Sequence, residues 1–243
     1  MPALRARNLS RFYGNHRAVE GLNLDLHPGE VLGLLGPNGA GKSTTMQMLT
    51  GNLAPSTGSV EICGVDLIEN PVGAKTHLGY LPEIPPLYRE LTVSEYLYLA
   101  ARLHRVPKSS LDAAVKQALL HCGLEEVAKR LVGNLSKGYQ QRLGIAQAIV
   151  HTPSVIILDE PTAGLDPLQI RDIRTLIEEL GHTHSIVLST HILAEAEALC
   201  SQLLILHQGR AVFSGSMEAL CSERESSSLE EIFVRLTRQE NPA

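Results

Sequence analysis

The stretch GPNGAGKST, residues 36–44, constrains the fold of this chain more than any other feature of its sequence. It matches the pattern G-x-x-x-x-G-K-[ST] and lies between an apolar run, VLGLL, and a helical pattern, STTMQMLTG. Glycines at such a junction let backbone N–H groups turn inward around phosphate oxygens. A glycine-rich turn with an exposed lysine is the alternative, but a match in strand–loop–helix context is rarely accidental. We therefore expect a phosphate-binding loop at the end of a strand.

Apolar runs elsewhere predict two kinds of strand. The runs VIIL (155–158), IVLS (186–189) and LLIL (203–206) are short and nearly continuous, which is typical of strands buried on both faces of a parallel sheet. Residues 3–8, 22–27 and 59–63 alternate or cluster apolar side chains as short antiparallel strands do. The sequence thus predicts an α/β fold in which a mainly parallel sheet accompanies an antiparallel β subdomain.

Helical patterns replace strands between residues 84 and 150. TVSEYLYLAARLH begins with Thr92 and has Glu95 three residues later, and SSLDAAVKQALLHCG begins with Ser109 and Asp112. The first start is a capping box, and Gly123 ends the second helix. We expect one domain over residues 1–243, with a core (1–83 and 151–220), an inserted helical lobe (84–150) and a short C-terminal tail helix (221–243).

Charge and hydropathy exclude some classes of function. The net charge is −5, so no general basic surplus exists to neutralise nucleic-acid phosphates, and no nucleic-acid partner is expected. No run approaches the roughly 18 uninterrupted apolar residues of a membrane span. If a membrane is involved, another chain supplies it.

Two acidic residues and a histidine follow the predicted buried strands. Asp159 and Glu160 end the run VIILDE, and His191 comes just after IVLS. Carboxyl ends of parallel strands meet at one sheet edge, so these side chains are expected beside the phosphate loop. A carboxylate there can hold Mg²⁺, and the next can orient or deprotonate an attacking water. A solvated acidic turn is the alternative for the pair, and a packing or surface position is the alternative for the histidine.

Together these motifs resemble the nucleotide-binding subunits of ABC transporters, over nearly the whole chain and in the family's order. By this resemblance, Asp159 is the Walker B acid, Glu160 the catalytic glutamate, 164–166 the D-loop and His191 the switch histidine; LSKGYQQR is similar to the signature motif, with Ser136 and Gly138 retained. The resemblance implies that Tyr13 stacks on the adenine of ATP. It implies that the nucleotide also contacts a larger set of residues: Gly36, Pro37, Asn38, Gly39, Ala40, Gly41, Lys42, Ser43, Thr44, Glu83, Ser136, Gly138 and Asp166. It implies Ser43, Asp159 and Glu83 as metal ligands and Glu160, His191 and Lys42 as catalytic residues.

Two sites depart from the commonest family pattern. Glu83 stands where a glutamine is usual, and its carboxylate cannot donate as an amide does. In the signature motif, Lys137 replaces a glycine and Tyr139 a glutamine; Lys137 is either an extra charge for the γ-phosphate or a solvated side chain. Both departures are familiar in the branch of type-two and gliding-associated exporters, which this chain resembles most.

The resemblance also implies how the chain works. Two subunits lie head to tail, and each signature helix faces the ATP of the other, which explains a second anion-binding helix start in one chain. We expect a homodimer, or a paired ATPase subunit, that hydrolyses ATP on the cytoplasmic face of the cell membrane and drives separate transmembrane permease subunits. The absence of a large regulatory domain of the kind many sugar importers append favours export.

The permease is expected to dock near residues 83–95, where Ile84, Leu87 and Tyr88 suit an apolar contact; packing within the helical lobe is the alternative for these three side chains. A soluble ABC-type ATPase acting on ribosomes or DNA is the alternative for the chain. Such relatives usually carry two cassettes or a long coiled-coil insertion, which this sequence lacks.

Overall fold

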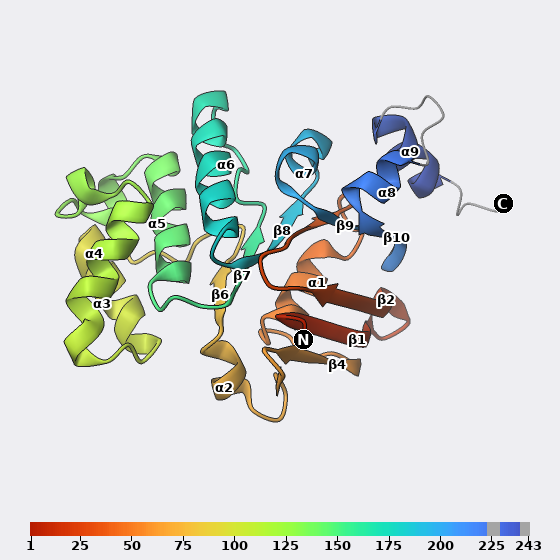
Figure 1. The fold of residues 1–243 in the computed structure, drawn as a ribbon, viewed down its shortest axis with the longest axis horizontal. Coiled ribbons are helices and arrows are strands. Elements are labelled where there is room, and N and C mark those ends of the chain that lie inside the picture. The colour runs from red at the N-terminus through yellow and green to blue at the C-terminus, as the bar shows by residue number, and fades with distance from the viewer. Residues whose placement is uncertain (223–228, 239–243) are drawn as a thin grey trace.

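A computed structural model describes residues 1–222 and 229–238 of the chain (Figure 1). Its main sheet has six strands in the order β10-β9-β3-β8-β7-β6. All neighbouring pairs are parallel except β10–β9. The strands are β3 (Val31–Leu35), β6 (Leu78–Leu81), β7 (Val155–Asp159), β8 (Ser185–Thr190), β9 (Gln202–His207) and β10 (Arg210–Ser216). The mainly parallel sheet is thereby confirmed.

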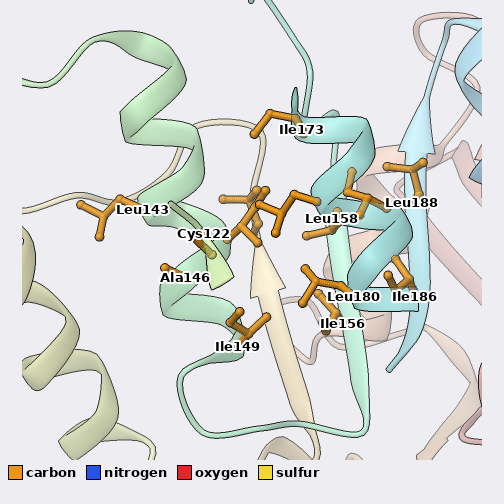
Figure 2. Packing of buried hydrophobic residues seen from close by; sticks show 14 of the residues in the cluster. Cys122, Leu143, Ala146, Ile149, Ile156, Leu158, Ile173, Leu180, Ile186 and Leu188 are labelled. Carbon is orange, nitrogen blue, oxygen red and sulfur yellow. The ribbon is translucent and has the colours of Figure 1, made fainter. Parts of the chain in front are cut away.

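Burial on both faces explains why the central strands are almost continuously apolar. In β7, Ile156 and Leu158 point into one hydrophobic cluster, whereas Val155 and Ile157 point into a second cluster on the opposite face. Figure 2 shows the first cluster, where helices α5 (Lys137–Ile149) and α6 (Pro167–Gly181) cover β7 and β8. Neither face can be left to water, so polar residues are confined to the strand ends.

A smaller antiparallel sheet, in the order β2-β1-β4-β5, covers part of the second face. Helix α1 (Lys42–Leu49) contributes Met46, Met48 and Leu49 to the same cluster. The strands are β1 (Leu4–Tyr13), β2 (His16–Leu26), β4 (Thr57–Ile62) and β5 (Val65–Asp66). The antiparallel subdomain is thus confirmed, although β1 and β2 run further than expected because they continue into a hairpin that pairs Tyr13 with His16.

Three longer helices lie between β6 and β7 in the chain: α3 (Val93–Leu103), α4 (Leu111–His121) and α5. The capping box of Thr92 and Glu95 is present. The expected start of α4 at Ser109 is wrong: Ser109 lies in a 3-10 turn (Lys108–Ser110), and Ser110 is the N-cap without a side-chain cap. Helix α5 contacts both α3 and the strands β6 and β7, so it joins the helical region to the sheet.

The remaining helices are α2 (Pro71–Lys75), α7 (Leu193–Leu199), α8 (Met217–Ser222) and α9 (Leu229–Arg238), with short 3-10 turns at Glu125–Val127 and Val132–Asn134. The expected terminal helix is α9; most of the Ser/Glu-rich stretch before it lies outside the described residues. Strands β6 and β10 were not anticipated. Across residues 1–222 and 229–238, none of the helices has the length and apolar character needed to span a bilayer.

Candidate functional site

The expected phosphate loop connects β3 to α1, between the two sheets. A Cβ on Gly36 would lie 2.5 Å from the carbonyl oxygen of Leu206, and one on Gly41, whose φ is +105°, would lie 2.6 Å from that of Ala18. Both neighbours are backbone, which cannot move aside cheaply. Glycine is therefore required at both positions by close packing as well as by the turn itself.

The lysine of this loop is folded inward. Lys42 is 6% exposed, and its Nζ donates to the carbonyl oxygens of Gly36 at 2.8 Å and Pro37 at 3.4 Å. The same Nζ lies 3.7 Å from Oε1 of Glu160. A buried ammonium needs such partners, because an unpaired charge in this position would carry a desolvation cost of several kcal/mol. The loop thus holds a positive charge at its centre.

The ends of β7 and β8 bring the acidic pair and the histidine to the same place. Oε2 of Glu160 lies 2.8 Å from Nδ1 of His191, although the two residues are distant in sequence. Glu160 has φ +48°, an uncommon conformation for a residue with a side chain. Its N–H donates to the Ser189 hydroxyl oxygen at 2.9 Å, which helps to hold that conformation. The turn directs the Glu160 carboxylate toward Lys42 instead of along the strand.

Asp159 is buried at the floor of this arrangement. Its carboxylate accepts a hydrogen bond from the Ser189 hydroxyl. Burial raises the pKa of the Asp159 carboxyl, and the negative charge of Glu83 raises it further, against the opposing effects of Ser189 and Lys42. Glu83 therefore lies close enough to influence Asp159 electrostatically. A second positive charge near Asp159 would relieve this cost.

A pocket of about 440 Å³ joins these groups, and it contains most of the expected site residues. Its lining comprises Tyr13, His16, Ala18, Pro37, Asn38, Gly39, Gly41, Lys42, Ser43, Thr44, Glu83, Glu160, Ala163 and His191. Tyr13 is half exposed at the tip of the β1–β2 hairpin, with the Arg11 guanidinium 4.8 Å from its ring centroid. His16, Ala18 and Ala163 were missed. Recognition of the turn at Gly14 would have predicted a hairpin that pairs Tyr13 with His16. That hairpin would have placed His16 and Ala18 near Tyr13.

Gly36, Ala40 and Asp159 do not line the pocket itself, but they lie next to residues that do. The remaining expected residues, Ser136, Gly138 and Asp166, contribute nothing to its lining. Ser136 is an exposed N-cap of α5, whose Oγ accepts weakly from the N–H of Tyr139 at 3.4 Å. Asp166 caps α6 by accepting from the N–H groups of Leu168 and Gln169 at 3.0 Å each.

The start of α5 packs against the start of α6 in the same chain. A Cβ on the buried Gly138 would lie 2.9 Å from the side-chain amide carbon of Gln169. The exposed Lys137 places its ammonium against Gly164, in the expected D-loop. The signature-like stretch and the D-loop thus form one continuous surface, separate from the lining of the pocket.

The chain is similar to known proteins over most of its length. Residues 19–163 match the profile of the family described as ABC transporter. The bacitracin transport ATP-binding protein BcrA of Bacillus licheniformis is 39% identical over 85% of this chain and 67% of its own length. A Nod factor export ATP-binding protein I of Paraburkholderia xenovorans is 37% identical over 95% of this chain and 76% of its own length.

A solved structure described as the ATP-binding subunit of an ABC transporter superposes with a TM-score of 0.87 and 34% identity, covering 97% of this chain and all of that one. The similarity extends well beyond the phosphate loop, which many unrelated ATPases share, because it includes both sheets and the helices between β6 and β7. This chain belongs to the ABC transporter family as one of its ATP-binding domains.

Proposed function

We propose that the chain binds Mg·ATP in the 440 Å³ pocket and hydrolyses it to drive export through separate transmembrane subunits. The observation that carries this proposal is the position of Glu160, whose carboxylate lies between His191 and Lys42. A carboxylate so placed can accept a proton from water attacking a phosphate held by the loop. Lys42 supplies positive charge to that phosphate, and Tyr13 offers a face for the adenine.

The residues expected to hold magnesium fit that ion in chemical type. Ser43 and Glu83 line the pocket, and Asp159 is buried next to Glu160, which also lines it. The hydroxyl of Ser43 and the two carboxylates offer oxygen atoms as ligands. Within the described parts of the chain, no three His, Cys, Asp or Glu side chains gather closely enough to hold a metal. This suits Mg²⁺, which binds proteins through one or two carboxylates together with substrate phosphates. When bound, the ion would neutralise phosphate charge.

The exposed start of α5 supports a role for a second copy. Ser136 is the N-cap of a helix of thirteen residues and does not line the chain's own pocket. A helix N-terminus attracts anions. We infer that it meets the γ-phosphate of ATP held by a second subunit, so that nucleotide closes the dimer. To shift the ratio of closed to open dimer from 1:99 to 99:1, ATP must bind the closed form more tightly by about 5.5 kcal/mol.

The membrane partner is proposed to dock beside the pocket. Ile84 is 83% exposed and Tyr88 56% exposed, whereas Leu87 packs against the core, so two of the three candidate apolar side chains remain accessible. A groove of about 540 Å³, with Pro82, Pro86 and His104 in its lining, lies next to them. Docking there would place the dimer on the cytoplasmic face of the membrane. Export as the direction agrees with the name of the Nod factor relative.

Glu160→Gln tests the proposal. The variant keeps the shape of the side chain but cannot accept the proton, so ATP binding should persist while turnover falls by roughly 100-fold or more. Size-exclusion chromatography with light scattering should show an ATP-dependent dimer. Glu178→Gln, an exposed change on α6, is the matched control. Wild-type turnover in Glu160→Gln would contradict the assignment, and ATPase stimulation by RNA or DNA would favour the soluble alternative.

A further inference from the structure

Helix α7 carries a carboxylate that is buried next to the proposed site without lining it. Glu195 is 1% exposed. Its Oε1 accepts from the Thr162 hydroxyl at 2.7 Å, and its Oε2 accepts from the Thr190 hydroxyl at 2.7 Å. Both oxygens therefore accept from hydroxyl groups, one in the segment after β7 and the other at the last residue of β8. An ionised side chain at such depth is costly unless its partners are well placed.

A cation completes this buried group. Nη2 of Arg174, on α6, lies 3.6 Å from Oε1 of Glu195. Nε of Arg174 is buried without a hydrogen-bond partner, so the guanidinium is held there by this carboxylate and by packing. The network thus joins α6 and α7 to the segments that carry Thr162 and Thr190; Figure 1 shows the two helices beside β7 and β8.

The two threonines stand at informative places in the chain. Thr162 comes two residues after Glu160, on the segment that leads to the D-loop. Thr190 comes directly before His191, and its Oγ1 also accepts from the N–H of Ile192 at 3.0 Å. The carboxylate of Glu195 therefore holds one loop that carries Glu160 and another that carries His191. The 2.8 Å contact between Glu160 and His191 depends on the relative position of these loops.

We propose that Glu195 is a positioning residue for hydrolysis, and the inference rests on the proposed function. By holding Thr162 and Thr190 together, it fixes His191 against Glu160 and sets where the D-loop begins. Glu195 is buried and does not line the pocket proposed for the nucleotide. Displacement of a reacting group by about 1 Å can cost a factor of 100 in rate, so the effect should fall on turnover more than on binding.

Glu195→Gln tests the inference with little change of volume. One hydroxyl contact remains and the other meets an amide N–H₂, so the pairing of the loops weakens. We expect kcat for ATP to fall about 10- to 100-fold, with the dissociation constant for ATP changed less than about threefold. Glu197→Gln removes the same charge from an exposed position on the same helix and should behave as wild type. Equal losses of kcat and ATP affinity would contradict positioning.

Thr190 provides an independent pair of variants. Thr190→Ser keeps the hydroxyl and should retain near-wild-type kcat, whereas the isosteric Thr190→Val should reproduce the loss of Glu195→Gln. If Glu195→Gln does not fold, this pair still decides the question. Equal kcat in the serine and valine variants would overturn the inference, because the hydroxyl-to-carboxylate bond would then have no role in turnover.

Hydrogen exchange separates this inference from the proposed function. In Glu195→Gln, amides of residues 160–166 and 190–192 should exchange faster than in wild type, whereas Glu197→Gln should leave them unchanged. If the wild-type chain neither binds nor hydrolyses ATP, the proposed function fails and the role of Glu195 in hydrolysis fails with it; if the wild type hydrolyses ATP, exchange tests the inference separately. Unchanged exchange in these two segments would contradict it.

Discussion

The chain contains two helix starts that suit an anion, and they differ in completeness. At α1, the phosphate loop is enclosed: Lys42 is buried, contacts Glu160 and faces a pocket that His191 also lines. At α5, Ser136 and Lys137 are exposed, and neither lines that pocket. The first start has a cation, an acid and a histidine arranged around it within one chain. The second has only the helix N-terminus and Lys137, whose ammonium lies against Gly164.

This difference indicates a division of labour. A helix N-terminus favours an anion by about 0.3–1 kcal/mol at an exposed position, far too little to hold a nucleotide without other groups. The start of α5 can therefore act only on a phosphate that something else presents. Its contact with Gly164 and Gln169 joins it to the D-loop surface, which is where a second subunit is proposed to lie.

The largest effect is expected from Lys42→Ala. Loss of the buried ammonium removes the positive charge of the loop and leaves Glu160 facing the phosphates, so ATP affinity should fall by a factor of roughly 100 or more, equivalent to about 3 kcal/mol. Titration with a fluorescent ATP analogue would measure this. Lys116→Ala, on the exposed side of α4, is the control. Unchanged ATP affinity in Lys42→Ala would contradict the proposal that the loop at α1, and not the start of α5, holds the chain's own nucleotide.

Ser136→Arg should affect the other site without touching the first. The bulky side chain at the head of α5 blocks the approach of a second subunit, so ATP should bind the monomer normally while turnover falls roughly 100-fold for lack of closure. Light scattering in the Glu160→Gln background would reveal the missing dimer. Ser110→Arg makes the same change at the N-cap of α4 and should leave the dimer intact. Wild-type turnover in Ser136→Arg would remove the reason for expecting a dimer.

The opposite end of the α5 helix gives a pH-dependent effect on stability. His151 follows that helix, its Nε2 lies 3.1 Å from the Leu78 carbonyl oxygen, and its ring stacks on His104 at 3.7 Å. Burial lowers the pKa of His151 to about 4, with contributions from His104 and His184. Between about pH 6.5 and 4 the unfolded chain binds a proton that the folded chain does not. Folding stability should therefore fall as the pH falls through this window, by on the order of 1–3 kcal/mol for His151.

Thermal unfolding of His151→Phe from pH 8 to pH 5 would measure this contribution. The phenyl ring preserves stacking, and although it loses the Leu78 contact at every pH, the variant should lose less stability on acidification than wild type. His27→Phe, an exposed change, should retain the wild-type pH dependence. If the stability of His151→Phe and of wild type depends on pH in the same way, protonation of His151 does not contribute to the loss of stability in acid.

The smallest effect is expected from Glu83→Gln. The carboxylate of Glu83 raises the pKa of Asp159, so its removal should lower that pKa and extend ATPase activity to more acidic pH. At neutral pH, kcat should change by no more than a few-fold. A pH–rate profile at saturating Mg²⁺ would test this, with Glu90→Gln as the exposed control. An acid limb that does not move would exclude coupling between the two carboxylates.

Local patterns predicted the fold well where one rule dominates. The runs at β7, β8 and β9 are apolar because both sheet faces are covered, and the capping box at Thr92 satisfies its helix start within four residues. Strand β6 escaped prediction because it is only four residues long and a proline, Pro82, follows it directly. Strand β10 escaped because it is an edge strand, where exposed and half-buried residues mix. The start of α4 was misplaced because two adjacent serines offered equivalent caps.

The sequence by itself determined the chemistry and the order of the motifs: a phosphate loop after a buried strand, an acid pair at the end of another and a histidine at the end of a third. These depend on backbone hydrogen bonding and burial, which act over a few residues. Only the tertiary structure decided which side chains meet. It placed Glu160 between Lys42 and His191, set Lys137 against Gly164 and buried Glu195 between Thr162 and Thr190. Such contacts join residues far apart in the chain, so they depend on how the strands are ordered in the sheet and on which loops that order brings side by side.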